Sequence, residues 1–372
     1  MTEPATIHLF RDRPMATVTP VVDLPARPDI RRILIIKWSA MGDVVMSTAV
    51  MEDIRRAFPH AELHLNAMPP WDMLFREDPR FAKVFAPDLR KKERGLKGML
   101  NWMRVVAAEQ YDLVVDLQTT DRSRLLLSLL TLTGKAPRYR IGNLPVFPYN
   151  VRPPVLPRPV HAATLMRSAI QAGGISARQP RPTLHVPQRH RAQAAALASR
   201  HGLIRGRYAV LLPGCQAAGY LKRWGAERYT ALAIELKGRG LIDHAVIVGA
   251  KDEMEECEAI AATCGDWAIN LCGQTHLLDL IPLCEEARLI VANDTGAAHM
   301  ASSTKTPMLV LCGPTDPNRI KPLGSHVLAL QAELPCMNCY CKHPCDHHTC
   351  MKVLTPEIAL QHLLPMLDQT GG

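Results

Sequence analysis

Short apolar runs rich in Ile, Leu and Val alternate with longer amphipathic stretches in the first part of the chain. The first three runs cover residues 33–37, 62–66 and 111–117. Runs of this length predict buried strands, and the amphipathic stretches after them predict helices. Because strands that alternate with helices form parallel sheets through crossover connections, the pattern predicts an α/β domain over residues 31–190.

A proline-rich stretch separates this region from a second region of the same kind. Ten prolines fall between Pro137 and Pro187, interrupted only by the helical pattern of residues 161–172. Strand-like runs then return at residues 208–212, 244–248, 289–292 and 308–311. We therefore predict a second, similar α/β domain over residues 205–354, and an amphipathic helix within residues 355–372.

The first thirty residues follow neither pattern. They contain five prolines and no continuous apolar core, which predicts a disordered tail over residues 1–30 and argues against a signal peptide. Elsewhere no uninterrupted apolar run reaches the roughly 18 residues that a membrane helix needs. Any contact with a membrane should therefore be peripheral.

The charge balance limits the kinds of partner. The chain has 44 Lys and Arg against 35 Asp and Glu, a net charge of +9, which favours a nucleotide, a phosphorylated glycolipid, a membrane surface or a nucleic acid. A nucleic-acid binder should interleave aromatic residues with Lys and Arg. Aromatic residues make up only 5% of this chain, so we expect no nucleic-acid partner.

A polar turn follows the first predicted strand, where residues 39–43 read Ser-Ala-Met-Gly-Asp. Ligands of doubly wound folds bind at this carboxyl edge of the sheet, so Asp43 could act as a general base on an acceptor hydroxyl. Alternatively, Ser39 or Asp43 could simply cap the helix that follows. The turn lacks the Gly-x-Gly-x-x-Gly pattern of dinucleotide binding.

A second polar segment opens the second domain. The strand that ends at Leu212 leads into a loop with Gly214, and Lys222 and Arg223 follow. Lys222 could neutralise charge on a departing diphosphate, or the Lys-Arg pair could be a solvated pair before a helix. Downstream, Glu253 follows the next strand and could accept hydrogen bonds from ribose hydroxyls, although acids in a first helical turn often only complement the helix dipole.

A third polar segment, residues 293–299, reads Asn-Asp-Thr-Gly-Ala-Ala-His and joins a strand to a helix of small residues. Backbone N–H groups at Thr295 and Gly296 would point at a phosphate. His299 lies one turn further on and could instead be a structural histidine. The polar turn at residues 313–317 could help to wall the same cleft.

These segments together resemble glycosyltransferase family 9, which includes the lipopolysaccharide heptosyltransferases, from about Ile33 to the C-terminal helix. The Ser-x-x-Gly-Asp signature matches residues 39–43, the Lys-Arg-Trp element matches 222–224, and the Asp-Thr-Gly-x-x-His element matches 294–299. Two departures stand out, since Gly225 replaces a common proline and the N-terminal tail lies outside the shared pattern.

The resemblance implies a role for each matched residue. Asp43 would be the catalytic base, and residues on the donor side would hold the nucleotide sugar: Gly214, Lys222, Glu253, Asp294, Thr295, Gly296 and His299. Glu253 would hold the adenosine ribose, a less secure match. The acceptor side would be lined by Ser39, Gly42, Gln118 and His161.

The family implies a glycosyltransferase-B fold, in which two Rossmann-like domains enclose an active-site cleft and the last helix crosses back to the first domain. It also implies inversion at the anomeric carbon, with Asp43 activating the acceptor and Lys222 with the turn at Gly296 stabilising the leaving diphosphate. This chemistry requires no metal, and the sequence has no Asp-x-Asp element that would hold one on the diphosphate.

The leading hypothesis is heptosyl transfer from ADP-heptose to a lipopolysaccharide core or related glycan acceptor. The partners would be a nucleotide-sugar donor, an anionic glycolipid and the inner leaflet of the inner membrane, which the enzyme would contact peripherally from the cytoplasm. Alternatives are a transferase of the same family that acts on a protein or another polysaccharide, a sugar-nucleotide epimerase, and a nucleic-acid-binding metal-finger protein.

Five cysteines crowd into residues 336–350, with three histidines among them. Soft ligands at this spacing suit tetrahedral zinc or iron, and the resemblance selects Cys336, Cys339, Cys345 and Cys350. A metal held by four protein ligands would be structural, because no coordination position stays open for substrate. The alternative is a loop of unpaired thiols. The other six cysteines occur singly, which fits a reducing compartment.

Overall fold

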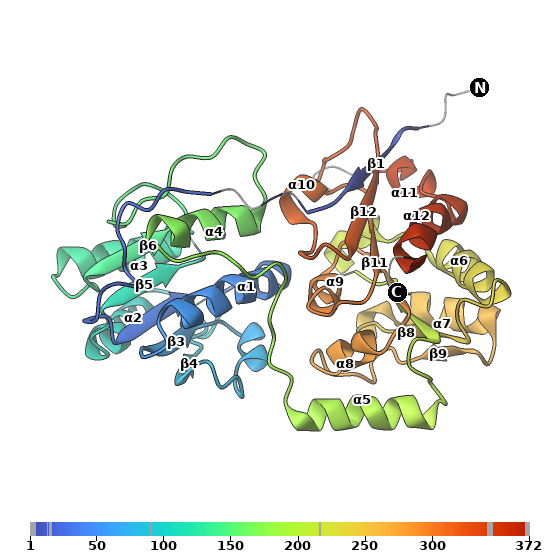
Figure 1. The fold of residues 1–372 in the computed structure, drawn as a ribbon, viewed down its shortest axis with the longest axis horizontal. Helices are drawn as coiled ribbons and strands as arrows, with labels where there is room; N and C mark the ends of the chain where they lie inside the picture. Colours follow the sequence, from blue (N-terminus) through green and yellow to red (C-terminus); the bar gives the residue numbers. More distant parts are fainter. Residues whose placement is uncertain are drawn as a thin grey trace. The chain divides into compact units, whose positions relative to one another are not determined.

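The chain folds into two compact units (Figure 1). The computed structural model describes residues 5–12, 14, 17–89, 91–118, 120–215, 217–340 and 345–368. The unit called N-terminal here comprises Pro14–His185, and the C-terminal unit comprises Met1–Arg13 together with Val186–Gly372. The C-terminal unit is therefore built from two separate segments of the chain.

The N-terminal unit contains a parallel five-stranded sheet in the order β4-β3-β2-β5-β6. Its strands are β2 (Arg32–Ile36), β3 (Glu62–Asn66), β4 (Lys83–Phe85), β5 (Leu113–Asp116) and β6 (Tyr139–Gly142). Every residue of β5 is buried, as expected for a central parallel strand that is covered on both faces.

The helical elements that the structure describes in this unit are α1 (Met41–Ala57), the short 3₁₀ helix η1 (Trp71–Leu74), α2 (Leu96–Ala108), α3 (Asp121–Leu132) and α4 (Ala162–Ala172). Trp102 of α2 and Leu127 of α3 share one buried cluster with Leu34 of β2, so α2 and α3 cover the same face of the sheet. Helices α1 and α4 pack against each other.

The C-terminal unit contains a seven-stranded sheet in the order β1-β12-β11-β10-β7-β8-β9, in which only the edge strand β1 is antiparallel. Its strands are β1 (Ile7–Phe10), β7 (Tyr208–Leu212), β8 (His244–Ile247), β9 (Ala268–Asn270), β10 (Leu289–Asn293), β11 (Met308–Cys312) and β12 (Val327–Ala332). The repeated strand and helix order along Val186–Gly372 agrees with the predicted second α/β domain.

The helical elements of this unit are α5 (Gln188–Arg200), η2 (Ala217–Lys222), α6 (Ala226–Gly238), η3 (Lys251–Glu253), α7 (Met254–Cys264), α8 (Leu280–Glu285), α9 (Gly296–Ala301), α10 (Pro317–Ile320), α11 (Thr349–Lys352) and α12 (Pro356–Asp368). Leu232 of α6, Ile260 of α7 and Leu363 of α12 meet the sheet in one core. Helix α5 packs on α8.

The fold class predicted from the sequence, two Rossmann-like α/β units, is confirmed. The boundary lies between His185 and Val186 and not at 190, which assigns α5 to the C-terminal unit. Helix α12 packs on α6 in the core of the C-terminal unit, and its crossing back to the first domain stays a prediction. No helix in the described part of the chain is both long and apolar enough to span a bilayer.

The expected disordered tail over residues 1–30 is wrong for the part that the structure describes. Residues 7–10 form β1, which pairs with β12. Further along, Val18, Leu24 and Ile30 are buried, and the backbone N–H of Leu24 donates to Gly173 O at 3.0 Å. These apolar residues are isolated along the sequence, so they make no periodic pattern, yet all three are buried, and Leu24 lies against the distant Gly173.

Candidate active site

The loop between β2 and α1 is held by Gln118, which follows β5. Gln118 Oε1 accepts hydrogen bonds from the backbone N–H groups of Trp38 at 3.0 Å and Ser39 at 3.1 Å. The Trp38 indole donates to Asn66 Oδ1 at the end of β3. Parallel strands bring their carboxyl ends to one edge, and the structure places Ser39 and Gln118 together there, while their role on the acceptor side stays a prediction.

Asp43 lies in the first turn of α1, next to Gly42, and is partly exposed. The N-cap residue of α1 is Ala40, whose side chain makes no capping hydrogen bond. Neither Ser39 nor Asp43 occupies the N-cap position, and the roles of both residues stay predictions.

A lysine is buried beside this loop. Lys37 is only 5% exposed, and its Nζ donates to Leu117 O at 3.3 Å. Burial lowers the pKa of Lys37, and the negative charges of Asp43 and Asp116 oppose that shift. The N-terminal unit thus places a poorly solvated cation within electrostatic range of the candidate base.

Asp116 organises the other side of this edge. Its Oδ2 accepts a hydrogen bond from the Tyr149 hydroxyl at 2.6 Å, and its Oδ1 accepts from the Gln118 N–H at 2.9 Å. Burial, together with the charge of Asp116, raises the pKa of Tyr149. A Cβ at Gly142 would lie 2.5 Å from the Tyr149 ring, so a glycine at the end of β6 is what lets Tyr149 reach Asp116.

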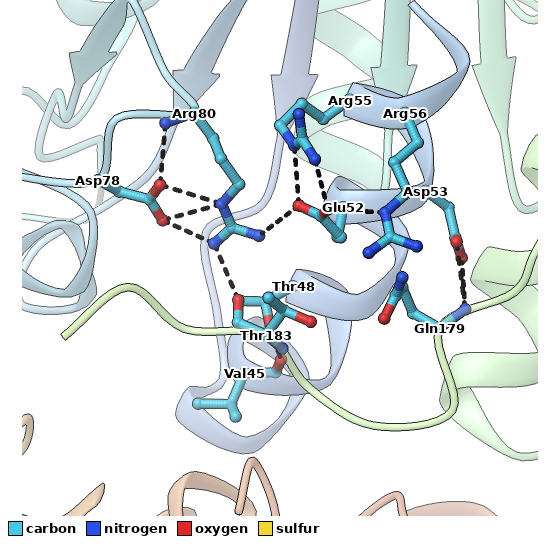
Figure 2. A network of polar contacts seen from close by, with 10 residues as sticks. All are labelled: Val45, Thr48, Glu52, Asp53, Arg55, Arg56, Asp78, Arg80, Gln179 and Thr183. Atoms are coloured by element: carbon cyan, nitrogen blue, oxygen red, sulfur yellow. Dashed lines mark hydrogen bonds and ion pairs between the residues drawn. The ribbon is translucent and has the colours of Figure 1, made fainter. Parts of the chain in front are cut away.

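Helix α1 is anchored by a buried polar network at its middle (Figure 2). Arg80 Nη2 contacts Asp78 Oδ2 at 2.6 Å and donates to Thr183 O at 2.8 Å, and Arg80 Nη1 lies 3.6 Å from Glu52 Oε2. The Thr183 N–H donates to Thr48 Oγ1 at 2.9 Å. The network ties the segment just before the unit boundary to the helix that carries Asp43.

Burial raises the pKa of Glu52, but hydrogen bonds from Arg55 and Arg56 outweigh it and bring the pKa to about 2. Glu52 is therefore a carboxylate throughout the physiological range. Asp53, the next residue, accepts hydrogen bonds at 3.1 Å from the backbone N–H groups of Arg178 and Gln179.

His161, predicted on the acceptor side, is the N-cap residue of α4. Its Nδ1 accepts a hydrogen bond from the Ala163 N–H at 3.2 Å. The structure thus gives His161 a capping contact, and its acceptor role stays a prediction.

In the C-terminal unit, three predicted segments meet at one carboxylate. Lys222 Nζ lies 2.8 Å from Asp294 Oδ2, and the Thr315 hydroxyl donates to the same oxygen at 2.9 Å. Burial lowers the pKa of Lys222, but the adjacent Asp294 charge outweighs burial, so the pKa is raised. Lys222 therefore remains a cation, and it is held at the edge of the sheet where β10 ends.

Asn293 joins the loops around this cluster. Its Oδ1 accepts from the Trp224 N–H at 3.2 Å and from the Tyr229 hydroxyl at 3.1 Å, and its Nδ2 donates to Pro213 O. Because Asn293 is fully buried, these bonds replace those that water would make. They set the path of the chain on both sides of Lys222.

Gly214 and Glu253, both predicted on the donor side, are in direct contact. A Cβ at Gly214 would lie 2.0 Å from the Glu253 carboxyl carbon. Glu253 Oε2 also accepts from the Ala250 N–H at 2.7 Å, and burial raises the pKa of Glu253. Glu253 thus supports the loop at the end of β8 and lies on the backbone of Gly214.

A second acid near this loop was not expected. Glu256 lies 3.6 Å from Arg223, measured from Oε2 to Nε. Burial raises the pKa of Glu256 to about 7, although Arg223 opposes the shift. In the sequence, Glu256 is one acid among several at the start of α7, so only the fold distinguishes it.

The predicted phosphate cradle lies at the start of α9, a helix of six residues. Thr295 is its N-cap residue, and its side chain accepts from the Ala298 N–H at 3.3 Å. The first N–H groups of a helix have no partner within it, so Gly296 presents a donor beside the Lys222 cluster. His299 is buried, in agreement with either of its two predicted roles.

Neither Lys37 nor Tyr149 was expected at the site. Lys37 had a signal in the sequence, because it closes an otherwise apolar strand. Tyr149 had none, since it lies in the proline-rich stretch and reaches Asp116 only through the path of the folded chain.

The four predicted metal ligands are present, and burial, followed by the charges of Cys339, Cys345 and Cys336, raises the pKa of Cys350 to about 11. Among the described residues, no three His, Cys, Asp or Glu side chains are placed to hold a metal ion together. Cys341 and His343 lie outside the described residues. The metal site therefore stays a prediction.

Asp43 belongs to the N-terminal unit, and Lys222 and Asp294 belong to the C-terminal unit. Gln118 contacts the loop that contains Ser39 in the first unit, and Lys222 contacts Asp294 in the second. The shared cleft that would join the two edges stays a prediction.

Comparison with known proteins gives a consistent result. The chain is 25% identical over 349 residues to lipooligosaccharide heptosyltransferase 2 of Haemophilus influenzae, a match that covers 90% of this chain and 99% of that protein. The solved structure of Escherichia coli ADP-heptose lipopolysaccharide heptosyltransferase II aligns with a TM-score of 0.68 at 21% identity, over 92% of this chain and 100% of that one.

A more distant fold relative is the iron-containing dodecameric heptosyltransferase TibC of enterotoxigenic E. coli, solved in complex with ADP-D-β-D-heptose. It aligns with a TM-score of 0.51 at 15% identity, over 92% of this chain and 77% of that one. The family model of glycosyltransferase family 9 (heptosyltransferase) matches residues 99–348. With that match over more than half of its length, the chain belongs to glycosyltransferase family 9.

Proposed function

We propose that this glycosyltransferase moves a heptose from ADP-heptose to a lipopolysaccharide core or related glycan acceptor, with inversion at the anomeric carbon. The observation that carries the proposal is the contact of Lys222 with Asp294 and Thr315 beside the start of α9. It places a cation and backbone N–H donors, which suit a diphosphate, beside a carboxylate, which suits sugar hydroxyls, at one sheet edge. The heptosyltransferase names of the relatives support the choice of sugar.

The donor would lie on the C-terminal unit. Lys222 and the N–H groups at Thr295 and Gly296 would contact the diphosphate, and Asp294 and His299 would contact the sugar. A preorganised cation there stabilises the charge that grows on the leaving ADP. Glu253, which lies on Gly214, would accept hydrogen bonds from the ribose.

The acceptor would lie on the N-terminal unit, where Ser39, Gly42, Gln118 and His161 would line its site. Asp43 would remove the proton from the acceptor hydroxyl as its oxygen attacks the anomeric carbon. The attack would come from the face opposite ADP, which inverts the configuration. This step requires the two sheet edges to enclose the same sugar in an interdomain cleft.

The proposed chemistry needs no metal. We propose that zinc or iron, if bound at Cys336, Cys339, Cys345 and Cys350, has a structural role, because four soft thiolates complete a tetrahedral shell. Metal analysis of the purified protein, with a variant that carries serine at Cys336 and Cys339 as control, would test this role separately from turnover.

We expect the enzyme to act in the cytoplasm, with an anionic glycolipid acceptor and a peripheral contact with the inner leaflet. The net charge of +9 supports this expectation, because anionic lipids attract basic surfaces. We expect no nucleic-acid partner.

The test is to measure melting temperature with ADP-heptose and with UDP- and GDP-sugars, since a ligand that binds the folded state raises it. ADP-heptose should stabilise the protein selectively and should be consumed when a heptose-deficient core acceptor is added. Stabilisation by a UDP- or GDP-sugar alone would overturn the donor assignment. Transfer only to a protein or another polysaccharide would overturn the acceptor assignment.

A further inference from the structure

Helices α2 and α3 of the N-terminal unit carry four large apolar side chains on their outer surfaces. Leu96 and Leu100 of α2 are 71% and 56% exposed, and Leu125 and Leu132 of α3 are 48% and 76% exposed. The two helices pack against each other, and Figure 1 shows them on the same side of the five-stranded sheet. We call this surface, with the cations described below, the α2–α3 face.

The leucines of α2 point outward because other residues of the helix occupy its buried side. In α2 the buried residues are Gly98, Trp102 and Val106, spaced by four along one side of the helix. Leu96 and Leu100 follow the same spacing on another side, so the helix cannot bury both sets against one sheet. Leu96 and Leu100 therefore lie on a side of α2 that its buried residues do not share.

Cations surround the leucines of α2. Lys91, Lys92 and Arg94 precede the helix, and Lys97 and Arg104 lie on it; all five are exposed. Within the part of the chain that the structure describes, Lys91, Lys92 and Lys97 form no ion pair. They are free to meet charges outside the protein.

The basic segment before α2 is held close to the helix. A Cβ at Gly98 would lie 1.8 Å from the carbonyl oxygen of Glu93, so the glycine lets this segment pack directly on α2. The Lys91 N–H also donates to Asp88 Oδ1 at 3.0 Å. The lysines of this segment therefore lie next to the helix that carries Leu96 and Leu100.

Acidic residues do little to cancel this charge. Glu93 Oε2 is buried, and Asp121 of α3 pairs with Arg124 at 2.6 Å. Arg122, also exposed, adds a further cation at the start of α3. The α2–α3 face therefore combines exposed leucines with a clear excess of positive charge.

We propose that the α2–α3 face docks on an anionic lipid surface, with the leucines entering the acyl boundary and the Lys and Arg side chains meeting lipid phosphates. Exposed leucines rimmed by Lys and Arg are the pattern of helices that lie in a membrane interface. Charge complementarity selects a membrane rich in anionic lipids over a neutral one. The inference rests on the proposed function, because a lipid-linked acceptor is what would bring this enzyme to a membrane.

The experiment measures binding of the full chain to vesicles of phosphatidylcholine with and without phosphatidylglycerol. The protein should bind the anionic vesicles, and high salt should weaken binding because it screens the lysines. The variant L96D/L100D should bind more than about tenfold more weakly. K97E should lower the partition coefficient at least roughly fivefold, since each basic residue near such a surface contributes about that factor.

A matched control is I234D, because Ile234 is an exposed apolar residue on helix α6 of the C-terminal unit. I234D should bind vesicles as the parent protein does, and all variants should keep the parent melting temperature. Equal binding to neutral and anionic vesicles, equal binding by L96D/L100D and the parent, or no vesicle binding at all would overturn the docking proposal.

The same variants separate this inference from the proposed function. With a delipidated, soluble acceptor, L96D/L100D should transfer sugar at the parent rate, because Leu96 and Leu100 are exposed residues of α2 and have no proposed role in donor or acceptor binding. If the parent protein binds anionic vesicles through this face but transfers no heptose, the proposed function fails and the docking surface stands.

Discussion

At the residue scale, the candidate site contains charged side chains whose electrostatic interactions are strengthened by burial. Lys222 and Asp294 are 72 positions apart in the chain, and they are held at 2.8 Å. In the other unit, Lys37 is almost fully buried within electrostatic range of Asp43. Charged groups removed from water interact strongly, so an ionic ligand at either sheet edge would meet a charge that is already held in place.

Asp43→Asn should lower sugar transfer by roughly 10²- to 10⁴-fold, the usual contribution of a general base. The amide keeps the size of the side chain, so nucleotide-sugar binding and the melting temperature should change little. The comparison is Asp121→Asn, an exposed acid in the first turn of another helix of the same unit, assayed with a delipidated acceptor. Parent-like turnover by Asp43→Asn would contradict the mechanism.

Glu256 should make stability depend on pH. Its pKa is raised from 4.5 to about 7, mainly by burial, so its contribution to stability is present below pH 4.5 and is lost as the pH rises through about 7. Above that pH, Glu256→Gln should be more stable than the parent by roughly 1–2 kcal/mol, after allowance for solvent screening.

Denaturant unfolding at several pH values measures this difference. Glu255→Gln is the control, because Glu255 is exposed in the same helical turn. A Glu256→Gln advantage that stays constant with pH would show that titration of Glu256 is not its cause.

At the element scale, helix α1 links the candidate base to the end of the N-terminal unit. Asp43 lies in its first turn, while Thr48 and Asp53 bind the backbone of the segment that precedes His185 (Figure 2). The boundary between the two units follows His185. These bonds therefore hold the last residues before that boundary against α1.

Arg80→Met should destabilise the N-terminal unit by about 3–5 kcal/mol, because it leaves the buried charge of Asp78 without its partner. The Thr183 amide should also exchange faster with deuterium, since Arg80 and Thr48 hold that residue. Chemical unfolding and hydrogen exchange measure the two effects.

Arg138→Met is the matched control. Arg138 pairs with Asp29, and both side chains are exposed, by 69% and 52%, so its loss should cost less than about 1 kcal/mol. Equal losses in the two variants would show that the network in Figure 2 is not a buried anchor.

At the scale of the whole molecule, the C-terminal unit is built from two segments of the chain that the N-terminal unit separates. Strand β1 pairs with β12, joining Ile7 to Ala332. Just after β1, Asp12 Oδ1 lies 2.7 Å from Nζ of the buried Lys321, and Asp12 Oδ2 accepts from the Gly324 N–H at 2.8 Å. The N-terminal segment is thus a structural part of the C-terminal unit.

Asp12→Asn should destabilise the C-terminal unit by about 2 kcal/mol near neutral pH, because Lys321 loses the charge that balances its burial. Burial lowers the pKa of Lys321 and Asp12 opposes this, so the loss should shrink at alkaline pH as Lys321 becomes neutral. Asp29→Asn, in the exposed pair with Arg138, should cost little at any pH. Denaturant unfolding at neutral and alkaline pH tests both, and a loss that grows with pH would contradict the assignment.

The sequence by itself determined the α/β class, the two units and the positions of the polar turns, because these follow from local spacing of apolar residues. It also determined most of the candidate site, since Ser39, Asp43, Lys222 and Asp294 each follow a strand whose carboxyl end can be located by pattern alone.

Only the tertiary structure decided which residues meet. The pairing of β1 with β12, the contact of Tyr149 with Asp116, and the burial that raises the pKa of Glu256 to about 7 join residues far apart in the chain or depend on what covers them. Periodicity reports which face of an element is apolar, but the contacts, solvation and charge of a side chain depend on the distant segments that pack around it.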